Sequence, residues 1–235
     1  MVVIAIVLWL FSKFSRLSSW DIVRVWGQGL NWVLRMVCRV RIEVYGTPPD
    51  NLESTLIVSN HTGPWETVSL QPFFTHPIVY VVKKQLLQWR YHFFALGIRT
   101  LKPIPIAREN NAGDLELILK DAKKHFEEKR QVLIFPEGTR LPVEQCVDMN
   151  PGGILLAKRL KCRLQILFID SEAWARGKIV KDFGLIFPRV IRVRFGPLFT
   201  SSEIKEEKVK TLHEKTLTFF KQCLGEERGE LGKLL

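Results

Sequence analysis

A histidine and a glutamate lie five residues apart in the stretch formed by residues 59–66, and together they could carry out acid–base chemistry. The stretch follows a short apolar run, residues 56–58, which predicts a buried strand. Pro64 suits the first position of a helix, so Glu66 would fall in the first helical turn. With His61 in the preceding loop, the imidazole can fold back onto that carboxylate. A carboxylate on one ring nitrogen would fix the tautomer and leave the other nitrogen as a general base.

The alternative interpretation of this turn is a capping carboxylate beside an incidental histidine. A second stretch favours the chemical interpretation. Residues 132–135 form another short apolar run, and it is followed by Pro136, Glu137, Gly138, Thr139 and Arg140. If both runs are neighbouring parallel strands, their carboxyl ends meet at the edge where open α/β sheets bind ligands. That edge would offer a base and a guanidinium, which suits a substrate that carries both a hydroxyl and a phosphate.

The two stretches resemble the first and third signature blocks of the glycerolipid acyltransferases. The first is Asn60-His61, four residues and Glu66, and the third is residues 135–140. Residues 101–108 resemble the second block, whose arginine is matched by Arg108. Most of the family has aspartate in place of Glu66, but a proteobacterial branch has glutamate. The likeness runs from about residue 40 to residue 197. It is closest to the bacterial branch that acylates 1-acyl-glycerol-3-phosphate.

The resemblance implies transfer of an acyl group from acyl-CoA or acyl carrier protein to the free hydroxyl of a lysophospholipid. With 1-acyl-glycerol-3-phosphate as acceptor, the product would be phosphatidic acid, a step of phospholipid biosynthesis. It implies His61 as general base and Glu66 as its orienting carboxylate. The residues implied in binding the acceptor are Arg108, Glu137, Gly138, Thr139 and Arg140. The two arginines would contact its phosphate.

Such a reaction needs no nucleophile from the enzyme, and the chain has no G-x-S-x-G elbow of a serine hydrolase. We expect no cofactor beyond the thioester co-substrate. We also expect no metal site, because H-x-x-x-x-E lacks the helical histidine pair of the zinc proteases. The four cysteines show neither zinc-site spacing nor C-x-x-C pairing, so we expect free and mostly buried thiols.

Two alternatives stay open on the sequence alone. One is an acyltransferase that acts on another lysolipid, in phospholipid remodelling. The other is a basic membrane- or nucleic-acid-binding protein without catalytic activity, because a net charge of +11 suits an anionic partner. The excess of positive charge lies in the first 200 residues, where the basic residues are spread out and match no nucleic-acid-binding module. We therefore expect an anionic membrane surface, and not nucleic acid, as the partner.

The rest of the chain supplies the elements that would position these residues. Apolar or alternating runs predict strands at residues 41–45, 56–58, 78–82, 132–135, 164–169 and 190–195. Helices are predicted at residues 112–130, 151–160 and about 202–224, the last one capped by Ser202. The recurring strand–helix order predicts an α/β fold with a largely parallel sheet flanked by helices, as the resemblance also implies. The last strand alternates, which predicts an edge strand with Arg192 and Arg194 outward.

The N-terminal residues predict contact with a membrane. Residues 2–11 are ten consecutive apolar residues, about half of the roughly 20 that a spanning helix needs. Residues 20–40 place apolar side chains at helical spacing with arginines between them, which is typical of an interfacial helix. A helix packed on the catalytic domain is the alternative. By the resemblance, the expected location is the cytoplasmic face of the bacterial inner membrane.

These patterns suggest a membrane-associated helical segment at residues 1–40, an acyltransferase domain at residues 41–225 and a frayed tail at residues 226–235. Residues 86–98 are rich in aromatics, which favours an acyl-chain groove or lipid contact, with core packing as the alternative. Two glycines begin the helix at residues 151–160. They predict a close approach there, and its N-terminus could hold the donor's phosphates.

Overall fold

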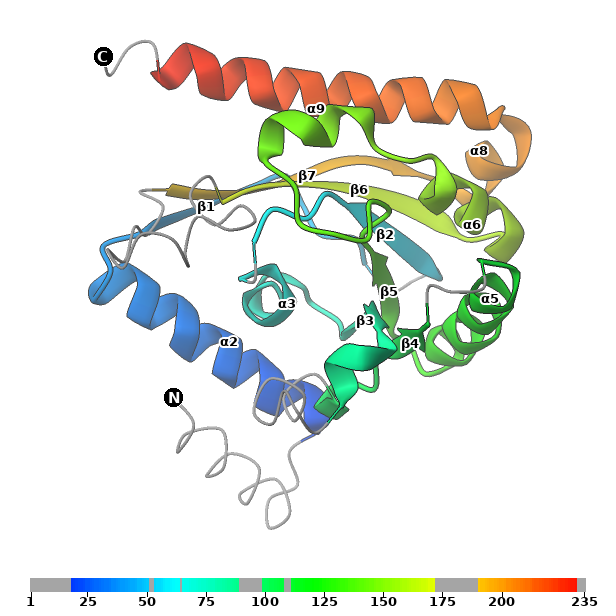
Figure 1. The fold of residues 1–235 in the computed structure, drawn as a ribbon, viewed down its shortest axis with the longest axis horizontal. Helices are drawn as coiled ribbons and strands as arrows, with labels where there is room; N and C mark the ends of the chain where they lie inside the picture. Colours follow the sequence, from blue (N-terminus) through cyan, green and yellow to red (C-terminus); the bar gives the residue numbers. More distant parts are fainter. Residues whose placement is uncertain are drawn as a thin grey trace.

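A seven-stranded sheet forms the centre of the protein, in the order β1-β7-β6-β2-β5-β3-β4 (Figure 1). The structure is a computed structural model that describes residues 18–50, 53–63, 65–88, 99–107, 111–171 and 190–231. The strands are β1 (Arg41–Tyr45), β2 (Thr55–Ser59), β3 (Ile78–Lys83), β4 (Ile104–Ile106), β5 (Gln131–Ile134), β6 (Arg163–Asp170) and β7 (Val190–Phe199). Neighbouring strands are parallel except for β6 and β7. The predicted α/β fold with a largely parallel sheet is confirmed.

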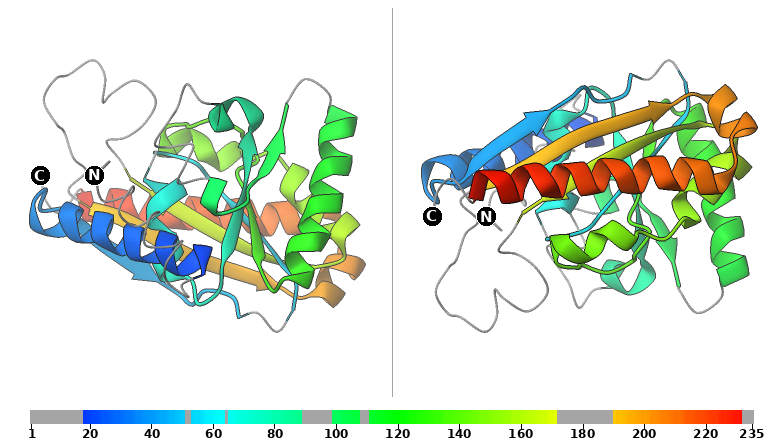
Figure 2. Two further views of the ribbon diagram at one scale, coloured as in Figure 1. Left: turned by 90° about the horizontal axis from the view of Figure 1, so that it is seen from below. Right: turned by 90° about the horizontal axis from the view of Figure 1, so that it is seen from above.

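Helices cover both faces of this sheet (Figures 1 and 2). Their bounds are α2 (Ser19–Met36), α3 (Glu66–Ser69), α5 (Asn111–Glu127), α6 (Gly152–Leu160), α8 (Ser201–Glu206) and α9 (Val209–Leu231). Short 3₁₀ helices are η1 (Gln71–Phe73), η2 (Lys84–Leu87) and η4 (Val143–Asp148). Successive strand side chains point to opposite faces. Leu56 and Val58 therefore join the core with α5, α6 and α9, whereas Ile57 joins the core with α2 and α3.

The prediction that residues 190–195 form an edge strand is wrong, because β7 lies inside the sheet between β1 and β6. In the register of β1 and β7, Arg192 stands opposite Glu43, and their side chains pair at 3.3 Å. Arg194 stands opposite Tyr45, whose ring centre lies 4.5 Å from the guanidinium carbon. The alternation of one strand shows which residues share a face. It does not show whether a segment from the other end of the chain pairs with that strand.

The C-terminal helix also differs from the prediction. Thr200, not Ser202, is the N-cap, and its hydroxyl and the carboxylate of Glu203 form a capping box. This starts the short α8, which ends at Glu206, and a separate α9 continues to Leu231 instead of ending near residue 224. The short strand β4 was not predicted, since three residues around a proline give no clear alternation.

Helix α2 packs on the rest of the fold with one face. The side chains of Val23 and Leu34 are buried in the core beside α3. Asn31 links the two helices, because it accepts a hydrogen bond from the indole of Trp65 at 3.0 Å and donates to the carbonyl of Ser69 at 3.1 Å. The sequence allowed two interpretations of this helix, contact with a membrane or packing on the rest of the protein. The contacts of Val23, Asn31 and Leu34 show the second.

The other face of α2 is apolar and uncovered by the described residues. Val25 is 49%, Trp32 59%, Met36 64% and Val37 69% exposed. No helix in the described residues is both long enough and apolar enough to cross a membrane. The apolar run at residues 2–11 lies outside the described residues.

Candidate active site

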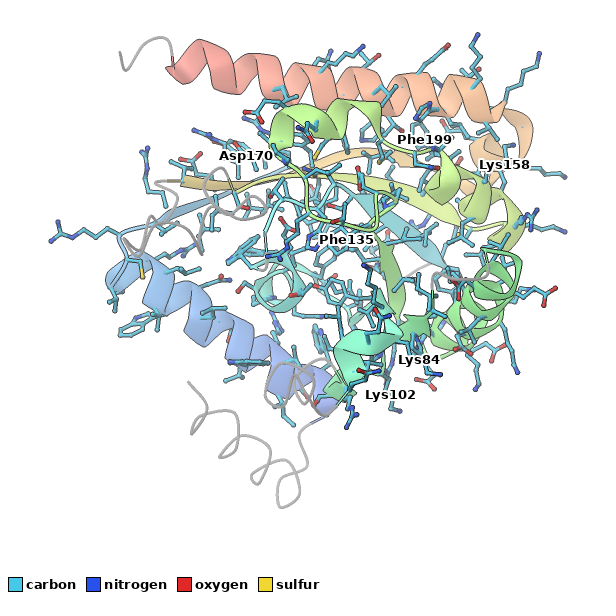
Figure 3. The ribbon with its side chains drawn as sticks, viewed as in Figure 1. Lys84, Lys102, Phe135, Lys158, Asp170 and Phe199 are labelled. Atoms are coloured by element: carbon cyan, nitrogen blue, oxygen red, sulfur yellow. The ribbon has the colours of Figure 1, made fainter. Side chains whose placement is uncertain are left out.

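The two turns that could carry chemistry lie together at the carboxyl ends of β2 and β5, which are neighbouring parallel strands. The backbone amide of Leu141 donates to the carbonyl oxygen of His61 at 2.9 Å. The imidazole of His61 stacks on the ring of Phe135, with 4.3 Å between ring centres. Phe135 lies near the middle of the molecule in Figure 3. The predicted meeting of the two turns is confirmed.

His61 folds back onto Glu66 as predicted, with Nδ1 bonded to Oε2 of the carboxylate. Glu66 is fully buried, and its Oε1 accepts hydrogen bonds from the Thr62 amide at 2.9 Å, the Thr62 hydroxyl at 2.7 Å and the Gly63 amide at 2.8 Å. The carboxylate therefore caps the backbone, as in the alternative interpretation, but the histidine is not incidental, because the same carboxylate holds it. The helix starts at Glu66, later than predicted, and Pro64 lies outside the described residues.

This arrangement selects the tautomer of His61. Because Glu66 acts as acceptor toward three other donors, Nδ1 of His61 donates to it. Nε2 is then the nitrogen with a free lone pair, which is the form required of a general base. The side chain of His61 keeps 17% of its surface exposed, so it is accessible from solvent.

Three buried side chains that the sequence analysis did not assign to the site hold this turn in place. The side-chain amide of Asn60 donates a hydrogen bond to the carbonyl oxygen of Ile169 in β6 and accepts one from the backbone N–H of the same residue, both at 2.7 Å. The hydroxyls of Thr62 and Ser171 lie 2.7 Å apart. Since Thr62 donates to Glu66, Ser171 donates to Thr62. Ser171 thus supports the carboxylate through Thr62, and no spacing in the sequence relates these two residues.

A cavity of about 200 Å³ lies beside His61. Its polar lining comes from Thr67, Lys83, Thr139 and Arg140. Arg140 is exposed and has no ion pair among the described residues, so its guanidinium is available to a ligand. Lys83 was not among the predicted site residues. It was noticeable only as the polar residue that ends the apolar strand β3.

Glu137 lies in the same turn but lines a different cavity. Gly138 adopts a positive φ of 63°, and its amide bonds to the Phe135 carbonyl at 2.9 Å. This tight turn directs Glu137 inward. Both carboxyl oxygens are buried and lack a hydrogen-bond partner on another described residue. Burial raises the pKa of Glu137 from 4.5 to about 7.

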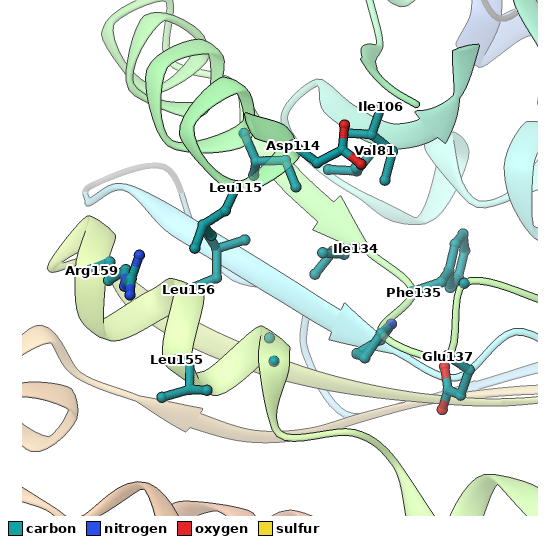
Figure 4. Close-up of a pocket in the computed structure, with 15 residues that line it drawn as sticks. Val81, Ile106, Asp114, Leu115, Ile134, Phe135, Glu137, Leu155, Leu156 and Arg159 are labelled. Atoms are coloured by element: carbon teal, nitrogen blue, oxygen red, sulfur yellow. The ribbon is translucent and has the colours of Figure 1, made fainter. Parts of the chain in front are cut away.

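The second cavity has a volume of about 530 Å³ and lies between β5, α5 and α6 (Figure 4). Its apolar lining consists of Val81, Ile106, Leu115, Ile118, Ile134, Phe135, Pro136, Leu155 and Leu156. Glu137 and Phe135 lie at one end of it in Figure 4, and Arg159 lies at the other. The aromatic stretch at residues 86–98 was expected to form such a groove. Its residues 89–98 lie outside the described residues.

The start of α6 approaches the sheet closely, as predicted from its glycines. A Cβ on Gly153 would come within 2.5 Å of Val58 Cγ2 and 3.5 Å of Pro136 Cγ. The first amide of the helix, that of Gly152, is already bonded to Oδ1 of Asn150 at 2.8 Å. This contact weakens the idea that the helix N-terminus holds the donor's phosphates.

Of the predicted site residues, the structure brings together His61, Glu66, Glu137, Gly138, Thr139 and Arg140. Arg108 lies outside the described residues. Within the described ranges no cluster of three or more acidic, cysteine or histidine side chains could hold a metal. All four cysteines are free and three are buried, as expected. Burial raises the pKa of both Cys146 and Cys162 to about 12, so these thiols stay protonated at neutral pH.

Comparison with known proteins adds independent evidence. The profile of the acyltransferase family matches residues 41–169. A 1-acyl-sn-glycerol-3-phosphate acyltransferase from Pseudomonas aeruginosa is 30% identical over 208 residues, which cover 87% of this chain and 77% of that protein. One with the same name from Helicobacter pylori is 26% identical, over 70% of this chain and 69% of its own length. The crystal structure of the 1-acyl-sn-glycerophosphate acyltransferase from Thermotoga maritima matches the fold with a TM-score of 0.57 at 14% identity, covering 90% of this chain and 79% of that one.

Proposed function

The chain belongs to the acyltransferase family, and from that premise we propose that it transfers a fatty acyl group from a thioester to the free hydroxyl of 1-acyl-glycerol-3-phosphate. The product would be phosphatidic acid. The observation that carries this proposal is that His61, which is bonded to Glu66, lines the same cavity as Arg140 and Lys83. A base beside two cations fits an acceptor that has both a hydroxyl and a phosphate. The two named relatives act on this acceptor according to their names.

His61 would act as the general base. Its Nε2 takes the proton of the acceptor hydroxyl while the hydroxyl oxygen attacks the thioester carbonyl carbon. Glu66 stabilises the imidazolium that forms, through the bond at Nδ1. The tetrahedral intermediate then breaks its carbon–sulfur bond, and the imidazolium returns the proton to the departing thiolate. The products are an ester and a free thiol, so protons and electrons balance.

The acceptor phosphate would lie against Arg140 and Lys83, which line the cavity beside His61. A guanidinium can form two parallel hydrogen bonds to phosphate, and an ammonium adds a point charge. The family resemblance adds Arg108 to this set.

The fatty chain of the donor would occupy the apolar cavity between α5 and α6. Its volume of about 530 Å³ and mostly aliphatic lining suit a hydrocarbon chain. The cavity begins at Phe135 and Gly138, which also line the cavity of His61. The thioester carbonyl would therefore lie between the two. Acyl-CoA and acyl carrier protein present the same thioester, so the chemistry is shared by both donors.

The protein would work on a membrane surface, seated through the uncovered face of α2. Trp32, Met36 and Val37 expose apolar surface there, and the exposed Arg35 and Arg39 lie beside them. An apolar stripe flanked by arginines is typical of helices that lie on anionic lipid. The proposed acceptor is itself a lipid, so contact of α2 with the membrane surface would bring the enzyme and its substrate together.

The test is an acyl-transfer assay with the full chain, a radiolabelled thioester donor and a panel of lysolipids with different headgroups. Wild type should acylate 1-acyl-glycerol-3-phosphate best, and His61→Ala should lower turnover by about 10²–10⁴-fold, as removal of a general base does. Glu66→Gln should also lose activity, because it keeps the shape and removes the charge that supports the imidazolium.

An unchanged melting temperature of His61→Ala would show that the fold is intact. Near-normal turnover by the folded variant would refute His61 as base. Preference for a different lysolipid would favour the remodelling alternative.

A further inference from the structure

Tyr80 is a buried residue of β3 to which the reaction described above gives no role. Its side chain is 1% exposed and lines neither of the two cavities described above. Its hydroxyl donates a hydrogen bond to the backbone carbonyl oxygen of Glu66 at 3.0 Å. Burial, together with the nearby charge of Glu66, raises the pKa of Tyr80 well above its usual value, so the hydroxyl keeps its proton for this bond. Tyr80 therefore holds the residue that orients the base.

The ring of Tyr80 also supports His61, through Phe135. In the parallel pair of β3 and β5, Tyr80 stands opposite Leu133, and alternate side chains of a strand share a face. Phe135 is the next side chain after Leu133 on that face, so it lies on the same side of the sheet as Tyr80. The ring centres of Tyr80 and Phe135 are 6.3 Å apart with 18° between the ring planes, and those of Phe135 and His61 are 4.3 Å apart with 17°. The three rings form one stack that ends at the imidazole.

This stack restricts the direction from which His61 can accept a proton. The lone pair of Nε2 lies in the plane of the imidazole ring, so the orientation of that plane sets its direction. Glu66 bonds to one edge of the ring, at Nδ1, and this bond alone would allow the plane to tilt. A flat ring against one face of the imidazole opposes the tilt. Proton transfer depends on the alignment of the reacting atoms, so the stack bears on the rate of the reaction.

We propose that Tyr80 is a positioning residue of the acyl transfer, which holds the backbone of Glu66 with its hydroxyl and the plane of His61 with its ring, through Phe135. This inference rests on the proposed function. Because Tyr80 is buried and lines neither cavity, it acts through these residues and does not touch the substrate. The alternative is a core residue whose loss lowers stability only.

The test uses Tyr80→Phe and Tyr80→Leu in the acyl-transfer assay. Tyr80→Phe keeps the ring and loses the bond to Glu66, so kcat should fall by about two- to tenfold, the range expected for one neutral hydrogen bond. Tyr80→Leu loses both contacts, and kcat should fall by about 10²-fold, as it does when a catalytic group shifts by about 1 Å. The KM for the lysolipid acceptor should stay unchanged, because Arg140 and Lys83 line the cavity proposed for it.

A second measurement separates positioning from a loss of stability. In a His61→Ala background, Tyr80→Leu should lower the residual rate no further, because a residue that acts through the base has no effect once the base is absent. The matched control is Phe74→Leu, which shortens another buried aromatic side chain of the same core, packed against Phe195. This control should lower the melting temperature comparably and leave kcat unchanged.

Wild-type kcat in either folded variant of Tyr80 would overturn the proposal, and so would a loss of rate in Tyr80→Leu that is equally large without His61. If Tyr80→Leu did not fold, the nearly isosteric Tyr80→Phe would decide by the same criterion. Failure of the acyl-transfer reaction itself would show differently, as an absence of any His61-dependent transfer in wild type. The two failures are therefore distinguishable.

Discussion

Arg140 and His61 line the same cavity, but their side chains are constrained very differently. His61 is held by Glu66 and by stacking on Phe135, whereas Arg140 is exposed and has no ion pair among the described residues. A group without a partner can give its full interaction to a ligand, because no internal bond must be broken first. We therefore expect Arg140 to act on substrate binding and His61 on the chemical step.

Replacing Arg140 with alanine should raise the apparent KM for 1-acyl-glycerol-3-phosphate and leave kcat nearly unchanged. A charge-assisted hydrogen bond contributes about 1.5–3 kcal/mol, which corresponds to roughly ten- to a hundredfold in KM. Arg140→Lys should recover only part of this, because an ammonium lacks the planar fork. Steady-state kinetics with a phosphate-bearing and a phosphate-free monoacylglycerol acceptor measures the effect.

The matched control is Arg41→Ala, which removes an exposed arginine from the edge strand β1. This variant should leave the KM for the phosphate-bearing acceptor and the KM for the phosphate-free acceptor unchanged. If Arg140→Ala impaired both acceptors equally, the guanidinium would have a structural or donor-binding role. The choice of a phosphate-bearing acceptor would then lose its support.

The chain order decides which of these residues could be found from sequence. His61 and Glu66 are close along the chain, so the type of local turn is enough to predict their contact. The pairing of Thr62 with Ser171 could not be predicted, because it depends on how far β6 extends beside β2. Glu137 was predicted as a site residue. The cavity that it lines could not be predicted, because this cavity depends on where α5 and α6 pack.

At the level of helices and strands, the site depends on how closely α6 approaches β2. Gly153 allows this approach, since any Cβ there would overlap Val58. The same helix start lies against Pro136, which directly precedes Glu137. The position of α6 therefore fixes both the width of the apolar cavity and the turn that carries the acid.

Gly153→Ala should destabilise the protein by about 1–3 kcal/mol, the usual cost of overpacking a core. It should also lower acyl transfer more than this stability loss explains, because α6 must move away from the turn. Gly29→Ala is the matched control. Gly29 lies within α2, and a methyl group added there would meet no other atom within 4 Å, so alanine should stabilise the helix by roughly 0.5–1 kcal/mol.

Urea unfolding of both variants measures these effects. Equal stability of Gly153→Ala and wild type would mean that α6 can shift at no cost. Its start would then not set the geometry of the site.

Elements with a strong local signal were predictable, and those defined by long-range pairing were not. The buried parallel strands β2, β3, β5 and β6 are apolar runs followed by polar residues, and all four were predicted. The interior position of β7 was missed because β1 comes from the opposite end of the domain. The start of α8 was missed because Thr200 and Glu203 form a capping box two residues before the expected cap.

Across the whole molecule, the two faces of the sheet differ in what covers them. Helices α5, α6, α8 and α9 enclose the face with the apolar cavity, whereas α2 and α3 cover the other (Figures 1 and 2). The amphipathic pattern of residues 20–40 was predicted from sequence. Which apolar side chains of α2 face the core could not be predicted, because the helix has apolar residues on two sides.

The outer face of α2 supports a prediction about membrane binding. Changing Trp32 and Met36 together to serine should weaken sedimentation with vesicles that contain anionic lipid. Burying one large apolar side chain contributes about 1.5–3 kcal/mol, so each loss should reduce binding by roughly tenfold or more. Transfer to acceptor embedded in vesicles should fall accordingly, while transfer to detergent-dispersed acceptor should not, because neither side chain lines the cavities.

The control for this experiment is Leu198→Ser, which removes an apolar side chain that is 39% exposed on β7, away from α2. It should sediment like wild type. If the double variant of α2 also sedimented like wild type, the membrane contact would have to lie elsewhere in the chain, and residues 1–17 would be the next segment to delete. If the double variant lost activity equally on both forms of acceptor, α2 would serve the fold through its contacts with α3 and not through contact with lipid.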